Sequence, residues 1–133
     1  MPSSPRKIKA ADATAAVELI TDKALGREVA SFEVFGINSL KTLEDPAQIS
    51  SQVLREAELS EDRISLTFDT MRIEIDLQRA GSVVWSNEQL SVDDTAVSRR
   101  PTGRLVFCES GVLSFEEPAK TKRIGFWIKS LTQ

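Results

Sequence analysis

The chain has 133 residues, of which 41% are hydrophobic and 28% charged, and its formal net charge is −3. Such a composition is typical of one globular domain that buries its own core without disulfides or metals. The sequence contains no histidine, which excludes a Ser-His-Asp triad, a Cys-His pair and a histidine-ligated zinc. Cys108 is the only cysteine, so we expect a small buried hydrophobe in a reducing compartment.

The weak negative charge argues against partners that need a positive field. We therefore predict no nucleic-acid partner and no membrane partner. Acidic residues interrupt the apolar stretch near the N-terminus, which excludes a signal peptide there. No apolar run approaches the length of a membrane span. We interpret the chain as a cytoplasmic protein.

The first half of the chain predicts a tail, a helix and a strand. Residues 1–10 are polar with two prolines and predict a flexible tail, which leaves 11–133 as one domain. Asp12 is a candidate N-cap for a short helix that would end near Gly26. Alternating apolar and polar residues over 27–37 then predict a strand.

The clearest helix signal lies in the next segment. Pro46 suits the first position of a helix and follows a capping aspartate. Ile49, Val53 and Ala57 follow at spacings of four, with polar residues between them. This pattern predicts an amphipathic helix over 46–59.

Alternation and short turns predict a three-stranded antiparallel meander over 63–86. A two-residue turn would place Leu66 opposite Ile75, and a glycine-containing turn would place Ile75 opposite Trp85. Trp85 is therefore assigned to the core.

The same arithmetic predicts a second three-stranded meander over 104–129. Its turns would place Leu105 opposite Phe115 and Leu113 opposite Phe126.

These elements predict an α+β fold. It would contain about seven mainly antiparallel strands, namely the two meanders and the N-terminal strand, arranged as a small barrel or a curved sheet. The amphipathic helix would pack on it, with a second helix near the N-terminus.

The second meander is apolar on both faces. Val112 would lie opposite Trp127, with Val106 beside them. If this face is uncovered, Trp127, Val112 and Val106 form a partner-binding surface with an aromatic anchor. If the helix over 46–59 covers the face, the three residues belong to the core.

A long connection without clear periodicity, residues 87–103, separates the meanders. Arg99, Arg100 and Arg104 lie in or beside it and could bind an anion, since guanidinium groups suit phosphate and carboxylate. The alternative is a solvated cluster of charges at a strand entrance.

We assign no catalytic residue, no metal and no cofactor from the sequence. The acidic residues of the long connection match no ligand loop. Surface charge accounts for the carboxylates that could run acid-base chemistry, Glu109, Glu116 and Glu117.

Two functions follow from these patterns, and no known family is recognised. The first is a small non-catalytic interaction module that binds a protein partner or associates with itself. The alternative is a small-ligand binder or sensor with a barrel-type pocket and an arginine-lined anion site. A carboxylate enzyme is a minor third hypothesis.

Overall fold

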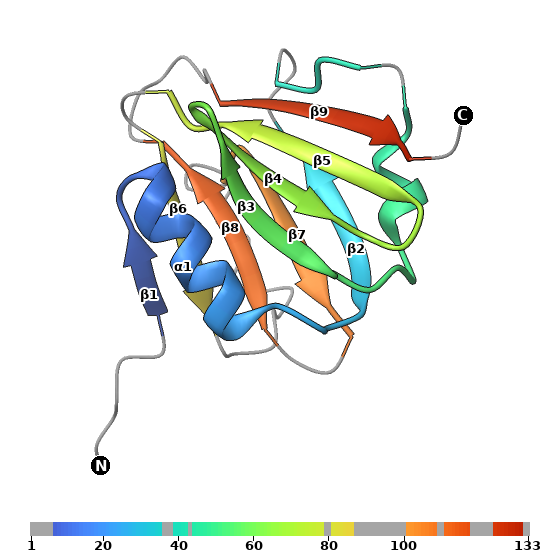
Figure 1. The fold of residues 1–133 in the computed structure, drawn as a ribbon, viewed down its shortest axis with the longest axis horizontal. Helices are drawn as coiled ribbons and strands as arrows, with labels where there is room; N and C mark the ends of the chain where they lie inside the picture. Colours follow the sequence, from blue (N-terminus) through green and yellow to red (C-terminus); the bar gives the residue numbers. More distant parts are fainter. Residues whose placement is uncertain are drawn as a thin grey trace.

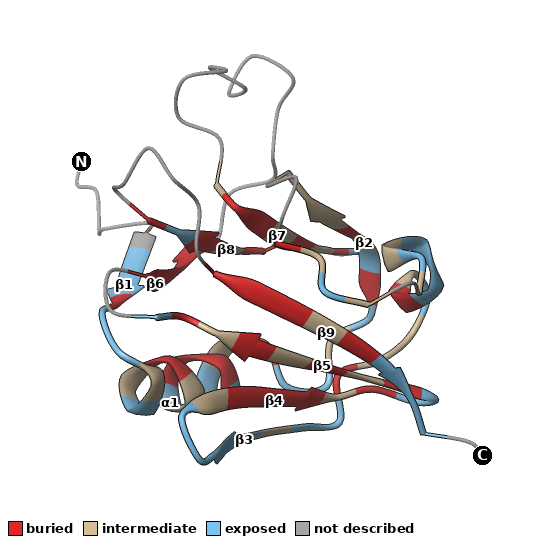
Figure 2. Cartoon of the chain, turned by 90° about the horizontal axis from the view of Figure 1, so that it is seen from above, coloured by how far each residue is buried: buried red, intermediate tan, exposed pale blue. Residues whose placement is uncertain are grey.

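The computed structural model describes two antiparallel sheets that face each other across one core (Figures 1 and 2). The residues that it describes are 7–35, 39–42, 44–78, 81–86, 101–108, 111–117 and 124–131.

The larger sheet has five strands in the order β1-β6-β8-β7-β2. Their bounds are β1 Lys7–Ala10, β2 Val29–Val34, β6 Ser82–Ser86, β7 Gly103–Phe107 and β8 Val112–Glu116. The smaller sheet has four strands in the order β3-β4-β5-β9. Their bounds are β3 Glu56–Ser60, β4 Arg63–Thr67, β5 Met71–Asp76 and β9 Gly125–Ser130. The helices are α1, Ala13–Lys23, and the short 3₁₀ helix η1, Pro46–Ile49.

This architecture confirms the predicted α+β class with mainly antiparallel strands. The strands form two separate sheets and do not close into a barrel. Figure 2 shows buried residues in the strands of both layers and in the helix beside them. Among the described residues, a cluster of apolar side chains occupies the core between the layers.

Aromatic rings join the two sheets at the centre of the core. The Phe126 ring of β9 makes edge-to-face contacts with Phe32 of β2 and Phe115 of β8, at centroid distances of 5.5 Å and 5.4 Å. Trp85 is 1% exposed and lies 5.8 Å from the Phe107 ring. The assignment of Trp85 to the core is thereby confirmed.

The helix predicted near the N-terminus is the one α-helix among the described residues. The Asp12 carboxylate accepts a hydrogen bond from the Ala15 N–H, as the capping pattern predicts. Ala16, Leu19 and Ile20 are buried in the same core cluster as both sheets. The helix therefore fills the space between the sheets along their β1-β6 and β3-β4 side (Figures 1 and 2).

The prediction of a longer helix over 46–59 is wrong. The helical turn ends at Ile49, and Ser51 has a φ of 72°, a left-handed conformation that no α-helix continues through. The segment from Glu56 onward is the edge strand β3. Ile49 and Leu54 are fully buried, whereas Val53 and Ala57, which follow Ile49 at spacings of four, are only half-buried.

Each predicted meander is right in its first hairpin, β4-β5 and β7-β8, and wrong in the neighbour of its third strand. After β5 the chain crosses to the other sheet, where β6 pairs with β1 and β8. Likewise β9 pairs with β5 instead of β8. The strands keep the predicted inward faces, because Leu66 and Ile73 are partners in β4-β5 and Leu105 and Leu113 are partners in β7-β8. These two hairpins are each displaced by two residues from the predicted register.

The predicted tail is also wrong for its last residues. Lys7–Ala10 form β1 at the edge of the five-stranded sheet, paired with β6. Ala10 is 4% exposed, so the end of this strand belongs to the core. Neither helix in the described part of the chain has the length and apolar character that crossing a bilayer requires.

Two glycines with positive φ provide a matched test of the core. Gly111 has a φ of 104°, and an added Cβ would lie 2.3 Å from the Trp85 indole. Gly26 has a φ of 86° with open space around it. We expect Gly26→Ala to cost about 1 kcal/mol from backbone strain alone, and Gly111→Ala about 3 kcal/mol because the indole must also move. Urea unfolding measures both values; equal costs would contradict the packing of Gly111 against Trp85.

Candidate functional site

Alternation along β9 divides its side chains between the core and the outer face of the four-stranded sheet. Phe126 and Ile128 point inward and are at most 1% exposed. Trp127 is half-buried and Lys129 exposed, on the opposite side. No helix of the described residues covers this outer face, because α1 lies between the sheets and η1 packs at β2 (Figure 1).

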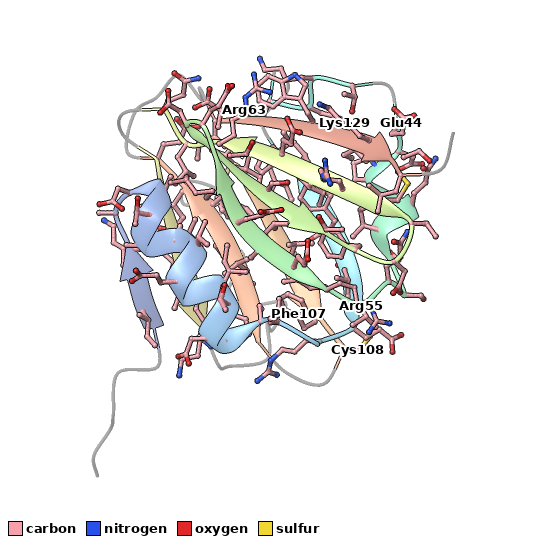
Figure 3. The ribbon with its side chains drawn as sticks, viewed as in Figure 1. Glu44, Arg55, Arg63, Phe107, Cys108 and Lys129 are labelled. Atoms are coloured by element: carbon pink, nitrogen blue, oxygen red, sulfur yellow. The ribbon has the colours of Figure 1, made fainter. Side chains whose placement is uncertain are left out.

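Four side chains from three strands meet on the outer face. The guanidinium carbon of Arg63 lies 3.8 Å from the centre of the Trp127 ring, a cation–π contact. Arg63 Nη1 donates a hydrogen bond to Glu74 Oε1, and Lys129 Nζ donates one to Glu74 Oε2, each at 3.2 Å. Arg63, Glu74, Trp127 and Lys129 are called the Trp127 cluster below. Figure 3 shows Arg63 and Lys129 toward the β9 side of the sheet.

The carboxylate of Glu74 is held ionised by its two partners. Burial by itself raises the pKa of Glu74, but the hydrogen bonds and charges of Lys129 and Arg63 outweigh burial and lower it below the usual 4.5. The Glu74 side chain is 17% exposed, whereas Arg63 and Lys129 are 37% and 50% exposed. Both cations are therefore more exposed to solvent than the carboxylate that they share.

Further positive charge surrounds the cluster. Arg72 is the Cα partner of Lys129 across β5 and β9. Within the described residues, Arg72 has no acidic partner, and its Nε is buried without a hydrogen bond. Lys41 places its Cε 3.2 Å from the position of a Cβ on Gly125, beside the same indole.

Acidic residues gather at the opposite edge of this sheet. The exposed carboxylates there belong to β3 and the β3–β4 turn, Glu56, Glu58, Glu61 and Asp62. Basic residues thus predominate toward β9 and acidic ones toward β3, although Asp76 of β5, the Cα partner of Gly125, adds a carboxylate beside β9. The net charge of −3 conceals this separation.

The residues predicted to bind a partner do not form one surface. Val106 and Val112 are Cα partners in the five-stranded sheet, whereas Trp127 belongs to the other sheet. The prediction that Val112 lies opposite Trp127 is wrong, because β8 and β9 do not pair. Val112 is also only 3% exposed.

The predicted anion site lies partly outside the described residues, which exclude Arg99 and Arg100. Arg104 is described on β7, where its Nε donates a hydrogen bond to Glu33 Oε1. Its guanidinium carbon lies 5.0 Å from the Phe35 ring. Arg104 therefore has an acidic partner of its own, and the grouping of the three arginines stays a prediction.

Of the three carboxylates considered for acid-base chemistry, Glu117 has a structural role. Glu117 is buried and accepts hydrogen bonds from Thr102 Oγ1 at 2.9 Å and from the Ile124 N–H at 3.0 Å. Glu116 is exposed, and Glu109 lies outside the described residues. In the described ranges, no group of three potential metal ligands occurs.

Cys108 corrects another prediction, because the thiol is exposed and not buried. It lines a surface pocket with Phe107 and Arg27 at the end of the molecule away from Arg63 and Lys129 (Figure 3). Figure 3 shows Phe107 and Cys108 at that end, near Arg55. Cys108 was expected to be buried within a strand, but it lies just after Phe107, the last residue of β7.

Comparison with known proteins identifies a shared fold. No protein-family model and no curated protein sequence matches the chain. Three similar solved structures are complexes of formamidopyrimidine-DNA glycosylase (Fpg, MutM) from Lactococcus lactis with DNA. The complex with DNA containing an AP site has a TM-score of 0.73, 11% identity, and coverage of 90% of this chain and 44% of that one.

Two further complexes of the same glycosylase give similar values. With abasic-site DNA the TM-score is 0.72 at 11% identity, covering 90% of this chain and 43% of that one. With DNA containing FAPY-dG the TM-score is 0.70 at 11% identity, covering 86% and 41%. The chain thus spans less than half the length of these glycosylase chains. At this identity the likeness establishes the fold.

These neighbours overturn the functional predictions from sequence. The glycosylase structures that match most of the present chain are bound to DNA. The predicted absence of a nucleic-acid partner is therefore wrong. The predicted protein-interaction module and its ligand-binding alternative are wrong with it. The exclusion of nucleic acid rested on the bulk charge, which says nothing of the local field over one face.

Sequence analysis selected Trp127 but missed Arg63, Glu74 and Lys129. The signal was present in the alternation of β4, β5 and β9, which places these three side chains on faces opposite the buried apolar ones. It stayed hidden because β9 was assigned to the wrong neighbour.

The lowered pKa of Glu74 predicts a pH-dependent contribution to stability. Since the folded pKa lies below the unfolded value, the contribution is present above the unfolded pKa and is lost as pH falls through the folded one. We expect Glu74→Gln to reduce the free energy of unfolding by about 0.5 kcal/mol near neutral pH, and by progressively less as the pH falls below the unfolded pKa. Urea unfolding across this range measures the difference. A difference that does not change with pH would contradict the ion-pair account.

Proposed function

We propose that this chain is a nucleic-acid-binding domain and that the Trp127 cluster, together with Arg72, forms its contact surface. One observation carries the proposal: two exposed cations converge beside a tryptophan on a sheet face that no described helix covers. The DNA-bound state of the glycosylases that share the fold supports the same reading.

The hydrogen bonds to Glu74 leave both cations able to bind phosphate. A guanidinium group has five N–H donors and an ammonium group three. Arg63 and Lys129 each use one of these donors on Glu74. The remaining donors can bind phosphate oxygens while the carboxylate holds both side chains in place, which lowers the entropy cost of ordering them.

Glu74 also weakens the positive field of the face that it orders. Its negative charge lies close to any phosphate bound by Arg63 or Lys129, and like charges at such distances repel. The proposed surface therefore combines good positioning with restrained affinity.

Two further expectations from sequence remain proposals. A cytoplasmic location agrees with a sequence whose one cysteine, Cys108, allows no disulfide within the chain. The treatment of 11–133 as one domain agrees with the core cluster, which draws on both sheets and α1.

The electrostatic part of the proposal predicts a loss of affinity on charge removal. We expect Arg63→Ala/Lys129→Ala to weaken binding of a labelled DNA oligonucleotide by roughly tenfold or more, and to reduce the slope of log K against log salt by about 1.4 on single strands. Fluorescence anisotropy over a salt series measures both. Lys9→Ala is the control, because exposed Lys9 lies on β1 in the other sheet. Failure of the wild-type chain to bind DNA at low salt would refute the proposal.

Removing the carboxylate should act in the opposite direction. We expect Glu74→Gln to tighten DNA binding by roughly threefold, because a neutral amide keeps the shape and removes a repelling charge. The same anisotropy titration measures it, and the gain should shrink as salt rises. Unchanged or weaker binding would place the phosphate contacts away from the Trp127 cluster.

A further inference from the structure

The outermost group of the Trp127 cluster is a flat cation with one face already stacked. The Arg63 guanidinium covers the Trp127 ring at 3.8 Å from its centre. The hydrogen bond from Nη1 to Glu74 Oε1, at 3.2 Å, limits its rotation above the ring. The Arg63 side chain is 37% exposed, so the stack presents an open surface to solvent.

The indole beneath is fixed in turn. An added Cβ on Gly125 would lie 2.9 Å from Trp127 Cη2 and Cζ3, so the indole lies directly against the backbone of this glycine. The indole therefore provides a rigid base for the guanidinium group. A flat cation on a fixed aromatic base is already positioned for a further planar ring.

We propose that the outer side of Arg63 is a stacking site for an unpaired nucleobase, which makes single-stranded nucleic acid the preferred ligand of this surface. The inference rests on the proposed function and specifies its ligand. Guanidinium planes stack on bases, and base stacking on such platforms tolerates any sequence because every base has a π face.

A duplex cannot use this contact. Inside a double helix both faces of each base are covered by neighbouring bases, and only base edges are open in the grooves. A stacking platform on a sheet surface needs a base face, as single strands provide.

The neighbouring cations suit the phosphates beside a stacked base. Lys129 follows Trp127 by two residues on the same face of β9, roughly 6.6 Å along the strand. Arg72 lies across from Lys129 on β5. One base on Arg63 and its adjoining phosphates on Lys129 and Arg72 would thus occupy one continuous surface.

The test compares two single strands that differ only in their bases. One is an oligothymidylate of about twelve nucleotides, and the other is a strand of equal length built entirely of tetrahydrofuran abasic residues, with the same phosphates. Anisotropy at fixed salt should give at least about fivefold tighter binding of the oligothymidylate by the full chain. A duplex of equal length should bind no better than the abasic strand.

Two variants assign the preference to the stack. Arg63→Lys keeps the charge but not the planar group, so it should lose the preference for bases and retain its binding of the abasic strand. Trp127→Leu removes the ring that orients Arg63 and should also reduce the preference; circular dichroism and urea unfolding check that both variants are folded. Lys9→Ala should keep the preference.

The outcomes separate the two proposals. Loss of the preference in folded Arg63→Lys supports the stacking site. Equal binding of both strands by the wild-type chain, or a preference unchanged in Arg63→Lys, overturns the stacking site and leaves the proposed function standing. Binding of neither strand overturns the proposed function together with this inference.

Discussion

The orientation of the candidate site depends on the position of Phe126 between the two sheets. Its ring lies against Phe32 and Phe115 of the opposite layer, in space that exists because Gly103 has no side chain; a Cβ there would lie 2.7 Å from the ring. Since side chains alternate along a strand, burying Phe126 turns Trp127 outward. The orientation of the candidate site is thus a consequence of core packing.

How far the sequence predicts this fold depends on whether a property is local. The inward face of each strand is local, because alternation records it, and the structure keeps the predicted faces of Leu66 and Leu105. The neighbour of each strand is not local. The prediction that consecutive strands pair as hairpins is wrong for β6, which crosses to the other sheet, and for β9, which pairs with β5. Alternation cannot separate the predicted neighbour from the observed one, because the same side chains are buried with either.

The same distinction explains the helix predicted over 46–59. The spacing of four selects Ile49, Val53 and Ala57, but only Ile49 of these is fully buried, and the buried Leu54 lies outside the spacing. The left-handed Ser51 interrupts the winding, and Asp69 then receives the Val53 N–H and Arg55 Nε at 3.0 Å and 2.8 Å. Contacts distant in sequence supply the hydrogen bonds that a helix would have provided.

The candidate site could be predicted only in part, since its cluster requires three strands in the correct order. Trp127 was visible as an aromatic residue on an alternating strand, but Glu74 becomes its neighbour only through the β5-β9 pairing. The bulk charge misled for a related reason. A face is attractive to phosphate when its own charges are positive within about 10 Å, the range beyond which salt screens the rest of the molecule. Acidic residues along β3 count toward the net charge but lie farther from Lys129 of β9 than Glu74 does, because β4 and β5 stand between them. Glu74 and Asp76 of β5 are the exceptions, because both lie next to β9. Glu74 weakens the positive field of the cluster, but the same carboxylate holds Arg63 over the indole.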